Sequence, residues 1–357
     1  LIWNPIEARK KIIEAINFTN INGRLPRQYS LPASGENFAY IDAREFIDSG
    51  LWVIDTIYQY LSYTNDSSIL SEMCSYIEIK GNIGLIKEKK DTLLNHLYLI
   101  MNYLLANIAE DTHCLRILYG DWNDAVDGLG KKDGFDGFTN GVSVMATFQL
   151  YSALTKMIDI VAHYDKDNFE IKEYYEEKRL EVYNGLKANA FVSKNNDYKV
   201  VHGWADKKEF YVGSFNDVDE KSRDSLTSNA FYVISDYFRK DDRYVKNVLN
   251  AYKRLDSKYG LLTFNPGFEK DAFKVGRIVN LPIGTAENGA VYIHGACFAI
   301  DSLFTLGEDE FGWNEIFKVI PITHPYISTT PFIMPNSYGF NKSIEVDGES
   351  MNDWFTG

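Results

Sequence analysis

Residues 142–190 read VSVMATFQLYSALTKMIDIVAHYDKDNFEIKEYYEEKRLEVYNGLKANA and contain two helical patterns separated by a short polar break. The first, Val142 to His163, predicts a long helix, and the second, Asn168 to Ala190, predicts a highly charged amphipathic one. Two consecutive helices joined by a few residues form a helical hairpin. This stretch therefore predicts a helical hairpin as the unit from which the fold is built.

Similar patterns recur on both sides of this hairpin. The spacing of apolar residues predicts further helices over 5–23, 46–63, 69–79, 87–109, 222–238, 241–255, 284–306 and 312–319, with Ser67 as the cap of the third of these. A short β-hairpin is expected within 191–211. The helices come in consecutive pairs, without a dividing linker or a fixed sequence period. We therefore expect one all-α domain, a closed toroid of helical hairpins whose long loops form a cleft at one end.

Composition limits the classes of function. The 357 residues include 45% hydrophobic and 24% charged residues, as in ordinary globular proteins, and the net charge is −13. Such a charge repels a phosphate backbone and an anionic membrane surface, so we expect neither a nucleic acid nor a membrane partner. No segment approaches about 18 uninterrupted apolar residues. The three cysteines lack CxxC spacing and are typical of intracellular thiols, which predicts a cytoplasmic protein.

The segment from Gly120 to Gly128 reads GDWNDAVDG and places three carboxylates and an indole in a glycine-bounded turn. A carboxylic acid can protonate a glycosidic oxygen when an apolar wall and neighbouring carboxylates raise its pKa, and Trp122 could supply that wall. The alternatives are a solvated acidic turn and a Ca²⁺ loop. The loop lacks the Gly at the sixth position and the Glu at the twelfth that an EF-hand requires.

Three other segments carry candidate residues. Glu287 to His294 enters an apolar helix, where the histidine either binds an anion or is satisfied within the core. Asp48 to Trp52 combines an acid and an indole with a helical glycine, which indicates a cleft contact or close packing. The terminal Thr356 and Gly357 can hold an oxyanion through hydroxyl and N–H groups, or form an ordinary turn. Nucleotide-binding glycine loops, HExxH, Cys/His clusters and GxSxG are absent from the sequence, and we expect no cofactor and no metal.

Together and in this order, the segments resemble the catalytic domain of glycoside hydrolase family 94, the inverting glycoside phosphorylases that include cellobiose phosphorylase. Residues 120–124 match the family's Gly-Asp-Trp-Asn-Asp signature, and residues 48–52 resemble its Asp-Asp-x-Leu-Trp segment. Glu287-Asn288-Gly289 with His294, residues 320–324 and residues 354–357 follow in the family's order. The resemblance implies an (α/α)6 barrel.

The resemblance also implies roles for individual residues. Asp124 would be the general acid, and the substrate would contact Asp121, Trp122, Asp48 and Glu287. His294, Thr356 and Gly357 would bind inorganic phosphate, the co-substrate. Phosphate would attack the anomeric carbon from the face opposite Asp124, invert it and release α-glucose 1-phosphate in a reversible reaction. Because phosphate is already an anionic nucleophile, no second carboxylate is needed to activate water.

Two departures from the family pattern concern the substrate. Cellobiose-type members carry Lys where this chain has Ala286, which argues against a cellobiose-like acceptor site. Residues 330–339 and 347–357 look more like the 1,2-β-oligoglucan phosphorylases, so β-1,2-linked gluco-oligosaccharides are the expected substrate. The resemblance further implies that 1–357 is a single, incomplete catalytic domain, with an N-terminal β-sandwich and the last barrel helix outside it. Family members often form homodimers.

Two alternative functions stay open at this point. One is an inverting hydrolase on the same toroid, in which Asp124 is the acid and Asp48 or Glu287 activates water. The other is a non-catalytic protein that binds glucans. Phosphate dependence of sugar release separates the phosphorylase from both.

Overall fold

The computed structural model describes residues 4–132, 137–323, 333–341 and 347–351. The longer helices are α1 Pro5–Ile16, α2 Ser49–Thr64, α3 Leu93–Leu105, α4 Val144–Tyr164, α5 Phe169–Asn189, α6 Leu226–Ile234, α7 Val245–Leu255, α8 Ile293–Thr305 and α9 Asp309–Val319. The strands are β1 Phe38–Tyr40, β2 Met73–Lys80, β3 Ile83–Thr92, β4 Val142–Ser143, β5 Phe191–Lys194, β6 Asp197–Val200, β7 Gly203–Trp204, β8 Tyr211–Val212, β9 Asp224–Ser225, β10 Asp256–Ser257, β11 Gly260–Leu261, β12 Phe264–Asn265, β13 Val291–Tyr292, β14 Ser337–Tyr338 and β15 Ser350–Met351.

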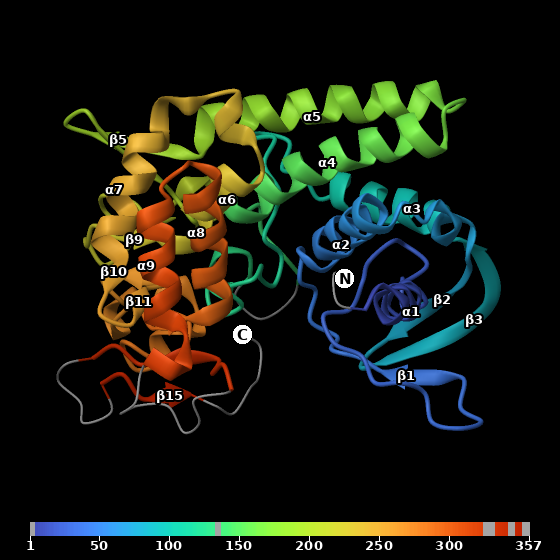
Figure 1. Cartoon of the computed structure of the whole chain (residues 1–357), viewed down its shortest axis with the longest axis horizontal. Coiled ribbons are helices and arrows are strands. Elements are labelled where there is room, and N and C mark those ends of the chain that lie inside the picture. The colour runs from blue at the N-terminus through green and yellow to red at the C-terminus, as the bar shows by residue number, and fades with distance from the viewer. Residues whose placement is uncertain (1–3, 133–136, 324–332, 342–346, 352–357) are drawn as a thin grey trace.

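The hairpin formed by α4 and α5 confirms the prediction from residues 142–190. Ser143 caps α4 by accepting a hydrogen bond from the Ala146 N–H at 2.9 Å. Most of α4 is buried, whereas α5 buries only four residues along its length. The difference makes α4 an inner helix and α5 an outer one, and the two run side by side in Figure 1.

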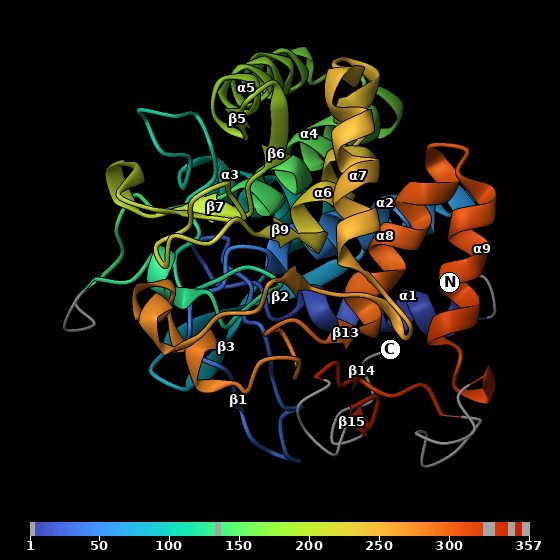
Figure 2. The same ribbon diagram turned by 90° about the vertical axis from the view of Figure 1, so that its left-hand side faces the viewer.

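The inner helices form an arc around a shared interior. Helix α2 packs against α4, α4 against α6, and α6 against α8. Helices α5, α7 and α9 each pack outside the inner helix that precedes them in the chain, as the two perpendicular views show (Figures 1 and 2). Most of the buried apolar residues of these helices belong to one continuous core. The architecture is compatible with a helical barrel, the general class predicted from the sequence.

The prediction of an all-α chain is wrong for residues 73–92. The helix expected over 69–79 is replaced by a 3₁₀ turn, Ser67–Ser71, followed by β2, and the helix expected from residue 87 starts only at Leu93. The turn is capped by Asp66, not by Ser67. Strands β2 and β3 pair antiparallel, and β1 joins the outer side of β3.

The sequence signal for this β-hairpin lies in its two-residue turn, Gly81-Asn82. Gly81 has a φ of 59°, which the turn of a tight hairpin requires. Buried residues on β2 follow an incomplete alternation because a bulge separates Ser75 from Ile77 in the pairing with β3. That bulge interrupts the two-residue period and lets the segment resemble a helix.

Further differences concern helix ends, and the helix expected over 5–23 ends at Ile16. The helix expected from residue 284 begins at Ile293, because Gly284 and Gly289 both have positive φ and the segment between them forms a turn that leads into β13. The helix expected over 222–238 is limited to α6. The expected hairpin within 191–211 is present as β5 and β6. Among the described residues, no helix combines the length and the apolar character needed to cross a membrane.

Candidate active site

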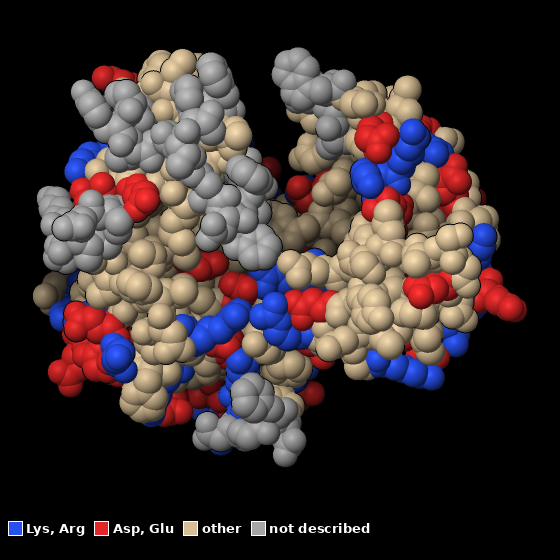
Figure 3. All heavy atoms as spheres, turned by 90° about the horizontal axis from the view of Figure 1, so that it is seen from below, with Lys and Arg blue, Asp and Glu red and all other residues tan. Residues whose placement is uncertain are grey.

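A cavity of about 360 Å³ lies where the first residues of α2 and α8 meet the loop that follows residue 118. Its lining comes from segments far apart in the chain: Ala15, Leu25, Pro26, Arg27, Tyr29, Phe46, Asp48, Ser49, Trp52, Val53, Asp121, Trp122, Glu287, Tyr292 and His294. Seen from below, the molecule is hollowed between its two sides, and acidic and basic side chains lie next to one another beside the hollow (Figure 3). Five of the predicted site residues therefore share one cavity.

The loop carrying the Gly-Asp-Trp-Asn-Asp signature is held by Gly120 and Asp121. A Cβ on Gly120 would come within 2.9 Å of the Phe46 ring, so a larger residue would push the loop outward. The carboxylate of Asp121 is 2% exposed and accepts hydrogen bonds from the Asn123 N–H at 2.8 Å and the Ser143 hydroxyl at 2.5 Å. These bonds fix the turn that presents Trp122 and Asp124.

His202 is a partner of this loop that sequence reasoning missed. Its Nε2 lies 3.2 Å from Asp121 Oδ2, without the alignment of a hydrogen bond, and its side chain is fully buried. Burial opposes ionisation of Asp121, but the nearby imidazole and the Ser143 hydroxyl hold the pKa of its carboxyl below the usual range. Asp121 is therefore a buried anion that orders the loop.

Trp122 and His294 are joined across the cavity. The indole Nε1–H donates to His294 Nδ1 at 3.0 Å. A neutral imidazole that accepts at Nδ1 carries its proton at Nε2, and burial lowers the pKa of His294, which favours this neutral form. The arrangement leaves Nε2–H as a donor for an anion. Gly295 allows the close packing, because a Cβ there would lie 2.9 Å from the indole.

Asp124 is held by two arginines that the sequence analysis did not single out. Its Oδ2 is paired with Arg27 Nη1 and lies 3.1 Å from Arg277 Nη2. Arg277 also donates to the Asp124 carbonyl oxygen from Nη2 at 2.7 Å and from Nε at 3.2 Å. The side chain of Asp124 is 15% exposed and does not line the cavity, but its ion pair with Arg27, which does, places the carboxylate beside it, between two guanidinium groups.

Two other carboxyl groups of the cavity resist ionisation. Burial, with a further contribution from the charge of Asp121, raises the pKa of Asp48 to about 7, although its Oδ2 accepts the Trp52 Nε1–H at 2.7 Å. Burial and the neighbouring charge of Asp124 also raise the pKa of Glu287. The buried acidic residues of the cavity are thus divided between Asp121, whose carboxyl pKa is lowered, and Asp48 and Glu287, whose pKa values are raised.

The segment bearing Glu287 is anchored by its neighbour Asn288, which is fully buried. The Asn288 side-chain amide donates to the carbonyl oxygens of Leu281 at 2.8 Å and Phe268 at 3.0 Å, and its Oδ1 accepts the Phe268 N–H at 2.7 Å. In the Glu-Asn-Gly segment, the asparagine therefore fixes the loop that positions Glu287.

The predicted phosphate ligands Thr356 and Gly357 lie outside the described residues. Within the described part of the chain, no group of three or more His, Cys, Asp or Glu side chains is placed to hold a metal ion. The signals for Arg27, Arg277 and His202 were weak, because each is a single residue in an irregular segment with no characteristic spacing.

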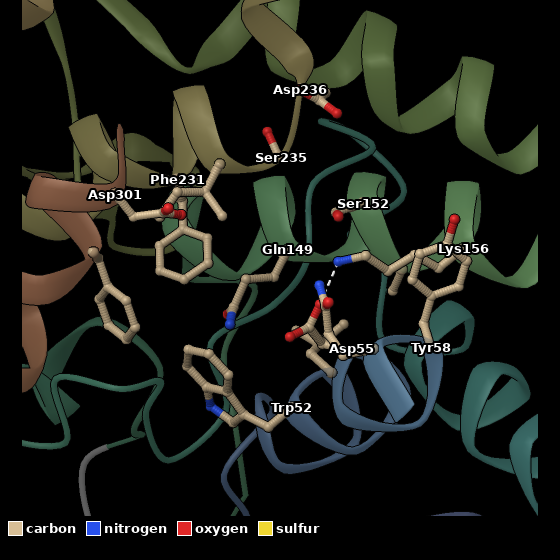
Figure 4. Close-up of a pocket in the computed structure, with 15 residues that line it drawn as sticks. Trp52, Asp55, Tyr58, Gln149, Ser152, Lys156, Phe231, Ser235, Asp236 and Asp301 are labelled. Atoms are coloured by element: carbon tan, nitrogen blue, oxygen red, sulfur yellow. Dashed lines mark hydrogen bonds and ion pairs between the residues drawn. The ribbon is translucent and has the colours of Figure 1, made fainter. Parts of the chain in front are cut away.

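A second cavity, of about 440 Å³, occupies the interior of the helical arc. Side chains from α2, α4, α6 and α8 converge on it, including Gln149, Phe231 and Asp301 (Figure 4). Trp52 lines both cavities. Its ring stacks on Phe298 at 5.6 Å, and Phe231 packs edge-on against both rings. Of these three rings, Trp52 lies on the boundary between the two cavities, and Phe231 and Phe298 line the interior one.

Comparison with known proteins identifies the family to which this chain belongs. Residues 13–357 match the family model described as the glycosyl hydrolase 94 superfamily, catalytic domain. The chain belongs to glycoside hydrolase family 94. The match confirms the family resemblance predicted from the order of the motifs, and it extends over almost all of the chain.

Curated relatives of this family 94 chain are named as phosphorylases. It is 25% identical to a solabiose phosphorylase of Paenibacillus borealis over 99% of the chain and 42% of that protein. It is 25% identical to a cellobionic acid phosphorylase of Neurospora crassa over 94% of the chain and 39% of that protein, and 23% identical to an N,N'-diacetylchitobiose phosphorylase of Vibrio furnissii over 87% and 36%. The chain thus spans about two fifths of the length of these relatives.

A solved structure shows the same fold at low sequence identity. The rhamnosidase from Klebsiella oxytoca with rhamnose bound superposes with a TM-score of 0.52 and 12% identity, covering 99% of this chain and 53% of the other. At this identity the likeness concerns the fold alone.

Proposed function

We propose that this chain provides the catalytic site of an inverting glycoside phosphorylase that transfers a glucosyl group from β-gluco-oligosaccharides to inorganic phosphate. The observation that carries the proposal is the Trp122–His294 hydrogen bond, which gives the cavity a neutral imidazole with its N–H available for an anion. The names of the curated relatives support the same reaction type.

In the proposed reaction, an oxygen of hydrogen phosphate bonds to the anomeric carbon as the bond from that carbon to the bridging oxygen breaks. The electron pair of the broken bond stays on the bridging oxygen, which takes the proton of Asp124. The proton carried by the phosphate is released to solvent, from which Asp124 is reprotonated. The products are α-glucose 1-phosphate and the shortened oligosaccharide.

The substrate linkage, the type of barrel and the remaining site residues are proposed from the sequence. We propose β-1,2-linked substrates from residues 330–339 and 347–357, and an (α/α)6 barrel from the order of the motifs. Asp121, Trp122, Asp48 and Glu287 would contact the sugar, and Thr356 and Gly357 would join His294 at the phosphate.

One observation favours the hydrolase alternative. Asp48 lines the cavity with a pKa of about 7, which suits a general base that activates water near neutral pH. The phosphorylase and the hydrolase share the acid, Asp124, and differ in the nucleophile.

The test is to incubate the purified protein with β-1,2-glucan oligosaccharides in the presence and absence of phosphate. We expect sugar release only with phosphate, and α-glucose 1-phosphate as the product. Release at the same rate without phosphate would establish the hydrolase. Measurable glucan binding with unchanged substrate under both conditions would establish a binding protein.

Asp124→Asn provides the second arm of this test. Because the leaving oxygen needs the proton of the acid, we expect turnover to fall by about 10²- to 10⁴-fold. Asp42→Asn is the matched control, since Asp42 pairs with Arg44, a residue to which the proposed reaction gives no role. Near-normal turnover of Asp124→Asn would show that another residue is the acid.

A further inference from the structure

Among the described residues that line the candidate active site, Arg27 is the only lysine or arginine. Three carboxyl groups, on Asp48, Asp121 and Glu287, line the same cavity. The guanidinium group of Arg27 lies over the Phe46 ring, 4.6 Å from its centroid. Stacking on an aromatic face fixes the plane of a guanidinium and leaves its N–H edge directed at a ligand or at another side chain.

Only part of that N–H edge is used. Within the described residues, Arg27 makes one side-chain hydrogen bond, from Nη1 to Asp124 Oδ2, and its Nε and Nη2 groups have no protein acceptor. The side chain is 34% exposed. A guanidinium presents five donors in a planar fork that matches two adjacent oxygens. Arg27 therefore has N–H donors at the cavity wall that are available to a ligand.

The second arginine on Asp124 is anchored differently. Arg277 bonds the backbone carbonyl oxygen of Asp124 as well as its carboxylate, and its Nε lies 3.6 Å from Asp127 Oδ2. Neither Arg277 nor Asp124 is part of the cavity lining, whereas Arg27 is. A ligand that enters the cavity can displace Arg27 from Asp124, whereas Arg277 keeps the acid in place.

In an inverting displacement, the contact between Arg27 and Asp124 puts Arg27 on the leaving-group side of the anomeric carbon. The nucleophile and the leaving group occupy opposite faces of the anomeric carbon, and the acid contacts the leaving oxygen. A side chain in direct contact with the carboxylate of Asp124 therefore lies on the side of the leaving sugar. His294, the proposed phosphate ligand, is joined instead to Trp122.

We propose that Arg27 is a binding residue for the leaving sugar and exchanges its ion pair with Asp124 for two adjacent oxygens of that sugar. The proposal rests on the proposed function. The two oxygens are either neighbouring hydroxyl groups of a neutral sugar or the carboxylate of a sugar acid, since both match the guanidinium fork.

The test uses the synthetic direction, in which α-glucose 1-phosphate is the donor and the acceptor sugar is varied. For Arg27→Gln we expect the KM of the acceptor to rise about 10- to 100-fold, as for the loss of hydrogen bonds to a charged group, with the KM of α-glucose 1-phosphate unchanged. Parallel series with glucose oligosaccharides and with sugar acids identify the oxygens. A higher KM for the neutral acceptors would show that Arg27 binds hydroxyl groups. A higher KM confined to the sugar acids would show that it binds a carboxylate.

Arg44→Gln is the matched control. Arg44 also lies over the Phe46 ring, 5.3 Å from its centroid, but it pairs with Asp42 outside the cavity. We expect its kinetics to match those of the unmodified protein. Arg27→Lys keeps the charge without the fork, so we expect an intermediate acceptor KM, and this variant replaces Arg27→Gln if the latter does not fold.

An unchanged acceptor KM in both Arg27 variants would overturn the proposal, and so would a rise confined to α-glucose 1-phosphate or phosphate. Failure of the proposed function gives a different result. In that case the unmodified protein itself neither synthesises oligosaccharides from α-glucose 1-phosphate nor depends on phosphate for cleavage.

Discussion

Replacing Asp48 with Asn should change how the stability of the protein depends on pH. Asp48 is 7% exposed, and its pKa in the folded protein is about 7, against about 3.9 for a carboxyl group in an unfolded chain. A folded-state pKa that is raised favours folding while the group is protonated. This contribution is lost progressively as the pH rises from about 4 to about 7.

The magnitude follows from the two pKa values. At pH 5 the carboxyl group is protonated in the folded protein and ionised in the unfolded chain, whereas at pH 8 it is ionised in both. Over this interval the unmodified protein should lose about 3 kcal/mol of unfolding free energy relative to Asp48→Asn, which has no titrating group at this position. The Asn carbonyl oxygen can still accept the hydrogen bond from Trp52.

The assay is urea unfolding of both proteins at pH 5, 6, 7 and 8, followed by the difference between their free energies of unfolding. Asp42→Asn serves as the control. Burial raises the pKa of Asp42, but hydrogen bonds from Arg44 outweigh it and lower the pKa, so the contribution of this group changes only below about pH 4. Its difference from the unmodified protein should therefore be constant over the same pH range. A constant difference for Asp48→Asn as well would refute the proposed protonation of Asp48.

Three further substitutions test the site and its support. Trp122→Phe removes the N–H that fixes His294, so we expect the KM for phosphate to rise about tenfold with unchanged far-UV circular dichroism; an unchanged KM would contradict that role. Asn288→Ala removes several buried hydrogen bonds, and urea unfolding should show a loss of about 3 kcal/mol, whereas a loss near zero would mean that the loop is held by other contacts. Gly295→Ala places a methyl group against the indole, and we expect a changed tryptophan fluorescence together with a fall of about tenfold in kcat/KM.

The sequence predicted the helical part of the fold well because the helices keep strong periodicity over long segments. Val144–Tyr164 and Phe169–Asn189 lie within two residues of their predicted ends. Residues 73–92 were assigned wrongly because the bulge between Ser75 and Ile77 breaks the alternation that identifies a strand. Local pattern alone could not show that β1, far earlier in the chain, would pair with β3.

The candidate site divides in a similar way. Asp121, Trp122 and His294 were predicted from motifs whose order along the chain is informative, and the structure brings them into one cavity. Arg27 and His202 were not predicted, because they reach the site only through the tertiary packing of irregular segments. An isolated arginine in a loop carries no signal that separates it from a solvated surface residue.

The aromatic layer of Trp52, Phe231 and Phe298 bears on the conservation of energy in the proposed reaction. A phosphorylase keeps much of the free energy of the glycosidic bond in a sugar phosphate, and every glucosyl group captured by water loses it as heat. Trp52 lines both the cavity inside the helical arc and the candidate active site, whereas Phe231 and Phe298 line only the cavity inside the arc. Of the three rings, Trp52 is therefore the one whose replacement by a small residue would join the two cavities and, in the proposed reaction, admit water from the arc.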